Sequence, residues 1–117
     1  MATRFEIVLK HGRLFYLQLR IANGEVVLHG LSSTSKIMTQ NEILRLRKAV
    51  EDDTRFVPHA NDDGTNFLII KHTDGTVLAK SVARPSLAEL DELALTIRAA
   101  ANAPMIDLSK QQRSNIA

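Results

Sequence analysis

Basic side chains on the first predicted helix are the strongest candidates for chemistry in this sequence. Arg45, Arg47 and Lys48 lie close together, and Arg45 and Lys48, three residues apart, share the outer face of that helix. With Arg20, Arg13 and Lys10 on neighbouring predicted strands, they predict a basic surface that meets phosphate groups. The alternative is a solvated helix face that binds nothing.

Tyr16 and Phe67 are the aromatic residues that strand alternation leaves on the face opposite Phe15. Stacking on nucleic acid bases needs aromatic rings, and this chain has one Tyr, four Phe and no Trp. Other apolar residues expected on the same face are Val8, Leu14, Val27, Ile69 and Leu78. We expect such a face to pack against the other half of the chain or the helices. The alternative is a surface for protein binding or self-association, using the edge strands as well.

The remaining polar residues form no catalytic or metal-binding motif. The four histidines lack H-x-x-x-H and H-E-x-x-H spacing. Asn61-Asp62-Asp63-Gly64 begins like a calcium loop, but no acidic residue stands at its twelfth position, so an acidic turn with Asx hydrogen bonds is expected. No nucleophile elbow, phosphate-binding loop or dinucleotide fingerprint occurs. The sequence therefore predicts a protein that is not an enzyme and uses no metal or cofactor.

Composition and charge are those of an ordinary globular protein. The 117 residues are 44% hydrophobic and 24% charged and include no cysteine, so disulfides and thiolate metal sites are excluded. No long apolar run or signal-peptide core is present, and we expect a cytoplasmic protein without a membrane segment. The formal net charge of +2 is uneven, because residues 1–51 carry +4 and residues 52–102 carry −3.

The sequence repeats itself at a constant offset of fifty-one residues, which defines the structural unit. Identical pairs at this offset include Arg4/Arg55, Phe5/Phe56, Leu17/Leu68, Gly24/Gly75, Val26/Val77, Ser35/Ser86, Leu44/Leu95, Arg47/Arg98 and Ala49/Ala100.

In each half, alternating apolar residues followed by a helical pattern predict three strands and a helix. Strands are expected at residues 4–10, 13–21 and 25–29, with Asn23-Gly24 as a type I′ hairpin turn. Alternation places one set of residues on the inward face, and it places Glu6 on the face opposite Phe5 and Ile7. The inward residues are Phe5, Ile7, Leu9, Phe15, Leu17, Leu19 and Ile21. The first helix is expected to begin at Thr39, in a capping box with Glu42, and Ser35 is a rival start one turn earlier.

The second half repeats this plan with a disrupted first strand. Pro58 follows Phe56, so this strand should lie at a sheet edge or carry a bulge. Strands at residues 65–72 and 77–81 flank Asp74-Gly75, and a capping box over residues 86–89 begins the second helix.

These elements predict an α+β fold of tandem duplicated β-β-β-α units, each an antiparallel meander plus a helix. The units are expected to be related by a pseudo-twofold axis within a single compact domain. The first repeat spans residues 1–51 and the second 52–102, and residues 103–117 form a polar C-terminal tail. The apolar residues 105–108 are expected to pack back on the body, with a partner-binding segment as the alternative, and residues 109–117 to fray.

The ordered combination of these features resembles the YegP-like proteins. It consists of Phe5, the strand before Asn23-Gly24-Glu25, the next hydrophobic strand, and Thr34-Ser35-Lys36 leading into a helix. The resemblance covers residues 4–101 as two copies and implies a small bacterial protein built from β-β-β-α modules. It implies no biochemical activity. Departures from the pattern include Glu42 and Leu93 in place of a helix glycine, and Gly30 in place of a strand serine that survives as Ser81.

The functional hypothesis is therefore a small non-enzymatic binding module, with a protein partner or self-association. The alternative is a nucleic-acid-binding accessory protein that uses the basic first repeat. The candidate surface consists of Tyr16, Arg20, Arg45, Lys48 and Phe67.

Overall fold

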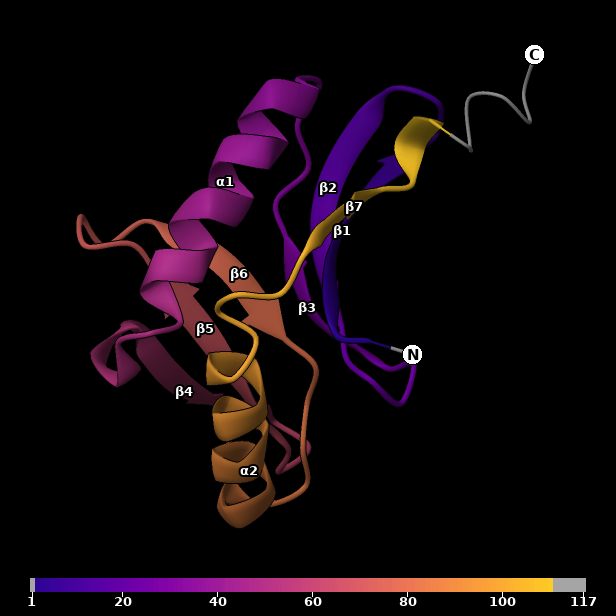
Figure 1. Ribbon diagram of the computed structural model, residues 1–117. Coiled ribbons are helices and arrows are strands. Elements are labelled where there is room, and N and C mark those ends of the chain that lie inside the picture. The colour runs from indigo at the N-terminus through magenta and orange to yellow at the C-terminus, as the bar shows by residue number, and fades with distance from the viewer. Residues whose placement is uncertain (1, 111–117) are drawn as a thin grey trace.

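The computed structural model describes residues 2–110. Within these residues, a single mixed sheet of seven strands carries both helices on one face (Figure 1). The strand order is β4-β5-β6-β3-β2-β1-β7. The strands are β1 (Arg4–Lys10), β2 (Leu14–Arg20), β3 (Val26–Gly30), β4 (Phe56–Ala60), β5 (Asn66–Lys71), β6 (Val77–Ser81) and β7 (Met105–Asp107). The helices are α1 (Lys36–Ala49), α2 (Leu87–Arg98) and a short 3-10 turn, η1 (Asp53–Arg55). The α+β class and the single compact domain are confirmed.

The helix-covered face of the sheet holds the core, and strand alternation selects its residues. Phe5, Ile7 and Leu9 of β1 and Phe15, Leu17 and Leu19 of β2 are buried, as the sequence predicts. They meet Ile43 and Leu46 of α1, while Leu90, Leu93 and Ile97 of α2 extend the same core over the second meander.

The turn between β2 and β3 differs from the predicted type I′ geometry, which needs positive φ at both central residues. Gly24 has φ +89°, but Asn23 does not have a positive φ. The Gly24 N–H donates to Ile21 O at 2.9 Å, and Ile21 N–H donates to Glu25 O at 2.9 Å. This pattern is a tight turn followed by a left-handed glycine, so a three-residue loop replaces the predicted two-residue one. The β5–β6 loop has the equivalent hydrogen bonds, from Gly75 N–H to His72 O and from His72 N–H to Thr76 O.

A β-bulge in each meander turns two apolar residues into the core. The β2–β3 register shifts between Leu19 and Arg20, and as a result both Val27 and Leu28 are fully buried. The β5–β6 register shifts between Ile70 and Lys71, and Leu78 and Ala79 are likewise both buried. The prediction that Val27 and Leu78 lie on the outer face is therefore wrong.

The two meanders join edge to edge through antiparallel pairing of β3 with β6. Ser81, opposite Leu28, is buried, and its hydroxyl accepts from Leu68 N–H and donates to Val82 O, both at 2.8 Å. Gly30 occupies the matching position of the first meander. A Cβ there would lie 2.5 Å from Leu17 Cγ, so the Leu17 side chain takes the space that a serine would need.

Helix α1 begins one turn earlier than Thr39. Ser35 is the N-cap, and its hydroxyl accepts from Met38 N–H at 3.2 Å. Thr39 is fully buried and donates its hydroxyl to Ser35 O, so the predicted start at Thr39 is wrong and the rival start is correct. The predicted start of α2 is confirmed, because Ser86 accepts from Glu89 N–H at 3.2 Å.

The outer strands of the sheet are β4 and β7. Strand β4 lies at one edge, as Pro58 predicts. At the other edge β7 pairs in parallel with β1, and Lys36 Nζ and Asp107 Oδ2, 2.9 Å apart, tie it to α1. Packing of residues 105–108 on the body is thus confirmed. Ser109 is buried, so residues 103–110 are docked rather than a free polar tail, and residues 111–117 of that predicted tail lie outside the described residues.

The acidic turn before β5 is confirmed, with Asp63 Oδ1 accepting from Thr65 N–H at 2.9 Å. Among the described residues, no helix has the length and apolar character needed to span a membrane.

Candidate binding surfaces

The open face, meaning the sheet face that neither helix covers, carries a buried carboxylate. Glu6 Oε2 accepts from Arg4 Nε at 2.6 Å, and Oε1 accepts from Gln18 Nε2 at 2.7 Å and Arg20 Nε at 3.0 Å. The Glu6 side chain is 0% exposed, and those of Arg4 and Arg20 are 29% and 28% exposed. Burial raises the pKa of Glu6, but the hydrogen bonds from Gln18, Arg4 and Arg20 outweigh it and hold this pKa below its ordinary value.

The hydrogen bond from Arg20 to Glu6 gives Arg20 a structural role. Its NH1 also donates to Gly24 O at 2.7 Å, which ties the end of β2 to the following turn. Arg20 lies on the open face, whereas Arg45 and Lys48 lie on α1, on the other side of the sheet. The single basic surface predicted from the sequence is therefore divided between two faces.

Tyr16 and Phe67 both lie on the open face and are half-buried. The rings belong to β2 and β5, which β3 and β6 separate, so they form no common stacking platform. Phe67 stacks on His59 with 5.4 Å between ring centroids, and Lys80 Nζ lies 4.3 Å from the Phe67 centroid. Neither the helices nor the other meander cover this face (Figure 1). The expected packing of Tyr16 and Phe67 against those elements is therefore wrong.

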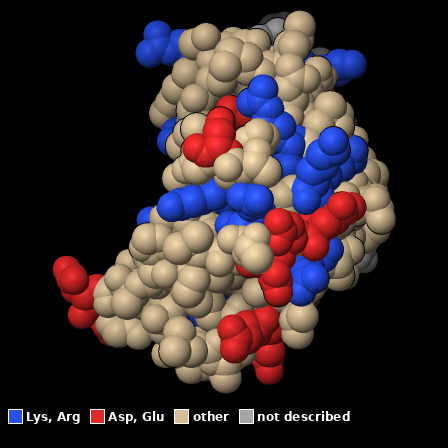
Figure 2. Space-filling model, turned by 90° about the vertical axis from the view of Figure 1, so that its left-hand side faces the viewer, with Lys and Arg blue, Asp and Glu red and all other residues tan. Residues whose placement is uncertain are grey.

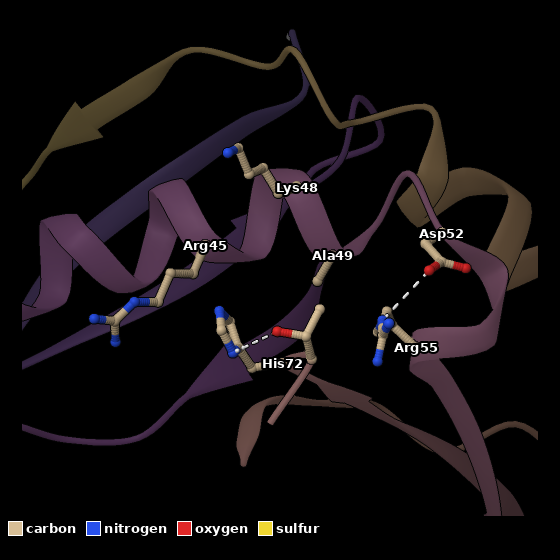
Figure 3. A pocket seen from close by; sticks show the side chains of 7 residues that line it. Arg45, Lys48, Ala49, Asp52, Arg55 and His72 are labelled. Atoms are coloured by element: carbon tan, nitrogen blue, oxygen red, sulfur yellow. Dashed lines mark hydrogen bonds and ion pairs between the residues drawn. The ribbon is translucent and has the colours of Figure 1, made fainter. Parts of the chain in front are cut away.

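A basic hollow of about 400 Å³ lies beside the C-terminal end of α1. Helix α1 supplies Arg45, Lys48 and Ala49, the segment after it supplies Asp52 and Arg55, and the β5–β6 hairpin supplies His72 and Thr73 (Figure 3). Sequence reasoning identified Arg45 and Lys48 but missed Arg55 and His72. The helical spacing gives the first two, whereas only the packing of α1 against β5 and β6 brings in the others.

Charge within the basic hollow is only partly compensated. Asp52 Oδ2 lies 3.3 Å from Arg55 Nε, and Asp52 also accepts from Thr54 N–H and from the Thr54 hydroxyl. These bonds from Thr54, together with Arg55, hold the pKa of Asp52 below its ordinary value. The side chains of Arg45 and Lys48 are exposed and make no hydrogen bond or salt bridge within residues 2–110. Figure 2 shows Lys and Arg side chains gathered across the middle of the left-hand side of Figure 1, with acidic side chains beside them.

An apolar groove of about 540 Å³ runs between α2 and the edge strand β4. Leu87 and Leu95 on its helix side are 63% and 64% exposed. The groove is lined further by Phe56, Pro58, Leu68, Leu90 and Ala94, and by the charged residues Asp53, Asp91 and Arg98. Sequence reasoning missed this groove. Helical spacing predicts Leu87 in the core with Leu90 and Leu93, which is wrong for Leu87, and Leu95 stands out in the sequence only as the repeat partner of Leu44.

The described residues hold no group of three or more His, Cys, Asp or Glu side chains placed to bind a metal ion. In the same part of the chain, Glu42 is the ionisable group with a buried, unpartnered carboxylate oxygen. Burial raises the pKa of Glu42, and the nearby charge of Arg45 opposes that rise without cancelling it.

No protein-family model and no curated protein matches the sequence. Solved structures do match. A UPF0339 protein from Shewanella oneidensis has a TM-score of 0.84 and 19% identity, with 92% of this chain and 92% of that chain covered. The yegP protein of E. coli, described as of unknown function, has a TM-score of 0.83 and 19% identity, with 92% and 93% covered. The chain thus has the fold of the YegP and UPF0339 proteins, and the YegP-like resemblance is confirmed at the level of fold.

Proposed function

We propose that this chain is a small non-enzymatic module that binds another protein by holding an amphipathic helix of that partner in the groove between α2 and β4. The observation that carries the proposal is the exposure of Leu87 and Leu95 along an apolar groove of about 540 Å³. Concave apolar surfaces of this size are typical binding sites, and two leucines left mostly in water need a reason.

The backbone of β4 favours a helix over an added strand as the occupant. Asn61 N–H donates to Thr65 O at 2.8 Å, which makes these two residues a hydrogen-bonded pair of the β4–β5 ladder. Because such pairs alternate along an antiparallel ladder, the backbone N–H and C=O groups of Phe56, Pro58 and Ala60 point away from β5. The Phe56 N–H bonds to Asp53 O and Pro58 has no N–H. The outer edge of β4 therefore offers mainly carbonyl acceptors, which suit a strand poorly. A helix docks through side chains alone.

Charge around the groove indicates which side chains the partner carries. Asp53 and Asp91 border the groove against one cation, Arg98, and residues 52–102 carry a formal charge of −3. Lysine or arginine side chains flanking the apolar face of the partner helix would meet these carboxylates and the outward carbonyls of β4. Such complementarity raises the association rate and excludes acidic competitors.

The test places a photoreactive amino acid at Asp91, beside the groove, in the full chain expressed in its host. We expect one crosslinked protein, with the crosslink mapping to an amphipathic segment. The variant Leu87→Ser/Leu95→Ser should weaken this capture about tenfold or more, because anchor side chains dominate binding. The matched control is Ile37→Ser/Leu44→Ser, which changes side chains 69% and 51% exposed on α1.

Three outcomes contradict the proposal. Crosslinking to a second copy of the chain would make the groove a self-association surface. Equal loss in the groove variant and the α1 control would indicate non-specific apolar adhesion. A crosslink that maps to an extended or acidic segment would exclude a basic amphipathic helix.

We also propose that the two halves arose by duplication and are related by a pseudo-twofold axis. Structural features recur at the sequence offset of fifty-one residues. The isolated bridge Phe15↔Ser33 corresponds to Asn66↔Arg84, and the two register shifts correspond in the same way. Superposing residues 4–49 on 55–100 in an experimentally determined structure tests this proposal.

A further inference from the structure

The basic hollow beside α1 concentrates positive charge without the partners that such charge needs. Arg45 and Lys48 are neighbours on the helix surface, at a spacing where like charges destabilise a helix. Neither side chain makes a hydrogen bond or salt bridge within the part of the chain that the structure describes. Arg55 contributes a third cation whose terminal guanidinium nitrogens make no hydrogen bond there, since Asp52 pairs with its Nε. Three cations and one carboxylate therefore line the hollow, and Glu42, which is not a lining residue, lies near Arg45.

The shape and lining of this hollow restrict the ligand. Its volume of about 400 Å³ is at the small end of ligand sites. Its lining provides N–H and O–H donors from Arg45, Lys48, Arg55 and Thr73, and no Phe or Tyr ring. A compact anion with several acceptor oxygens matches this donor set, whereas a nucleobase would find no Phe or Tyr face to stack on.

The end of α1 explains part of this charge but not all of it. Helix C-termini carry partial negative charge, which Arg47 and Lys48 in the last turn complement. Arg45 lies a turn earlier, and Arg55 and His72 belong to other elements. Because the helix terminus itself repels an anion, the side chains must supply all of the attraction, and the affinity should fall with salt.

We propose that the basic hollow is a phosphate site, which binds the dianionic phosphate of a phosphomonoester through Arg45, Lys48 and Arg55. A free phosphorylated metabolite and inorganic phosphate present the same group. This site lies apart from the α2–β4 groove and shares no lining residue with it. Its test is therefore independent of the proposed protein-binding function.

The experiment titrates the full chain with inorganic phosphate, with O-phosphoserine and with a short single-stranded oligonucleotide. Each titration is followed by amide NMR at one low ionic strength. We expect saturable shifts of the Lys48, Asp52, Arg55 and Thr73 amides with both phosphomonoester-type probes. The variant Arg45→Gln/Lys48→Gln should weaken binding about tenfold or more, since it removes two charge-assisted contacts.

The matched control is Lys10→Gln/Arg13→Gln, which removes two exposed positive charges at the β1–β2 turn. It should leave the affinity within about twofold, because distant surface charges are screened. Equal loss in both variants would overturn the site in favour of a general electrostatic attraction. Saturation by the oligonucleotide alone would assign the hollow to nucleic acid, and an absence of saturable shifts with every probe would refute the proposal.

Discussion

Glu6 is the centre of a hydrogen-bonded cluster on the open face. A buried carboxylate is costly unless its oxygens are bonded and its charge is matched. Here Arg4, Gln18 and Arg20 donate to its two oxygens, and all come from β1 and β2. The cross-strand pairs Glu6↔Gln18 and Arg4↔Arg20 place these groups side by side. Arg20 also donates a hydrogen bond to Gly24 O, which links this cluster to the β2–β3 turn.

Replacing Glu6 by Gln should lower the free energy of unfolding by about 2 kcal/mol, because two guanidinium groups lose their counter-charge. The arginines are partly exposed and can turn to solvent, so the loss should stay below that of a fully buried pair. Urea unfolding measures it. Glu25→Gln is the control, since Glu25 pairs with Arg84 at 2.9 Å but is 39% exposed, and it should cost less than about 1 kcal/mol. Equal losses would show that burial of Glu6 contributes nothing.

The stability difference between wild type and Glu6→Gln should also depend on pH. The pKa of Glu6 is lower in the folded state than its ordinary value of 4.5. Its stabilising contribution is therefore complete above pH 4.5 and is lost as the pH falls through the folded-state pKa. The stability difference between wild type and Glu6→Gln should be constant near neutral pH and shrink below 4.5. A difference that grows on acidification would contradict the assignment.

Strand alternation alone predicted the face of Glu6 but not its burial. The pattern assigns Glu6 to the side opposite Phe5 and Ile7, which is correct. Burial depends on Gln18 and Arg20, which reach Glu6 only once the β1–β2 register is fixed. Tyr16 and Arg45 were likewise placed on the correct faces, while the partners that define their surroundings come from other strands and turns.

At the scale of elements, the first helix shows how local signals compete. Thr39 with Glu42 fits a capping box, yet the helix begins after Ser35. The earlier start adds a turn and brings Thr39 into the core, where its hydroxyl bonds to Ser35 O at 3.3 Å. The repeat would have resolved this competition, because the fifty-one-residue offset aligns Ser35 with Ser86, the N-cap of α2.

Ser35→Ala should lower the free energy of unfolding by about 1 kcal/mol, because the Met38 N–H loses its acceptor at the first turn of α1. Chemical denaturation followed by circular dichroism measures the change. Asn41→Ala, at an exposed position within α1, is the control and should have no cost, since alanine is the better helix former. An unchanged stability in Ser35→Ala would mean that the helix has another cap.

The two β-bulges could not be predicted from the alternation of residues within a single strand. Val27 and Leu78 were placed outward because alternation assumes an unbroken ladder. Val27 and Leu78 are instead the extra residues of β3 and β6 at the register shifts, so each is buried beside its neighbour. The edge position of β4 was predictable, because Pro58 lacks the N–H that an inner strand must donate. That property is local, whereas a register shift belongs to a pair of strands.

At the scale of the whole molecule, several contacts among the described residues join the two halves, including the ion pair of Glu25 with Arg84. Strand β3 pairs with β6, and α1 of the first half packs against β5 and β6 of the second. The chain then returns from α2 to β1: Phe5 N–H donates to Pro104 O at 2.8 Å and Arg47 to Ala103 O at 2.6 Å. A repeat in sequence defines each unit but not which edges meet, so neither the β3–β6 junction nor the pairing of β7 was predictable.

This connectivity predicts that the halves cannot fold alone. Fragments 1–51 and 52–117 should each give unfolded circular dichroism and poorly dispersed amide spectra. Each leaves a junction strand unpaired, and chains of 51 and 66 residues bury only a small core. The full chain should unfold in one cooperative transition with the same midpoint by circular dichroism and by NMR. Mixing the fragments should restore dispersed signals, since β3, β6 and α1 supply the missing contacts. A fragment that folds alone, or a second transition in the full chain, would mean that the two meanders are separate folding units joined by a weak contact.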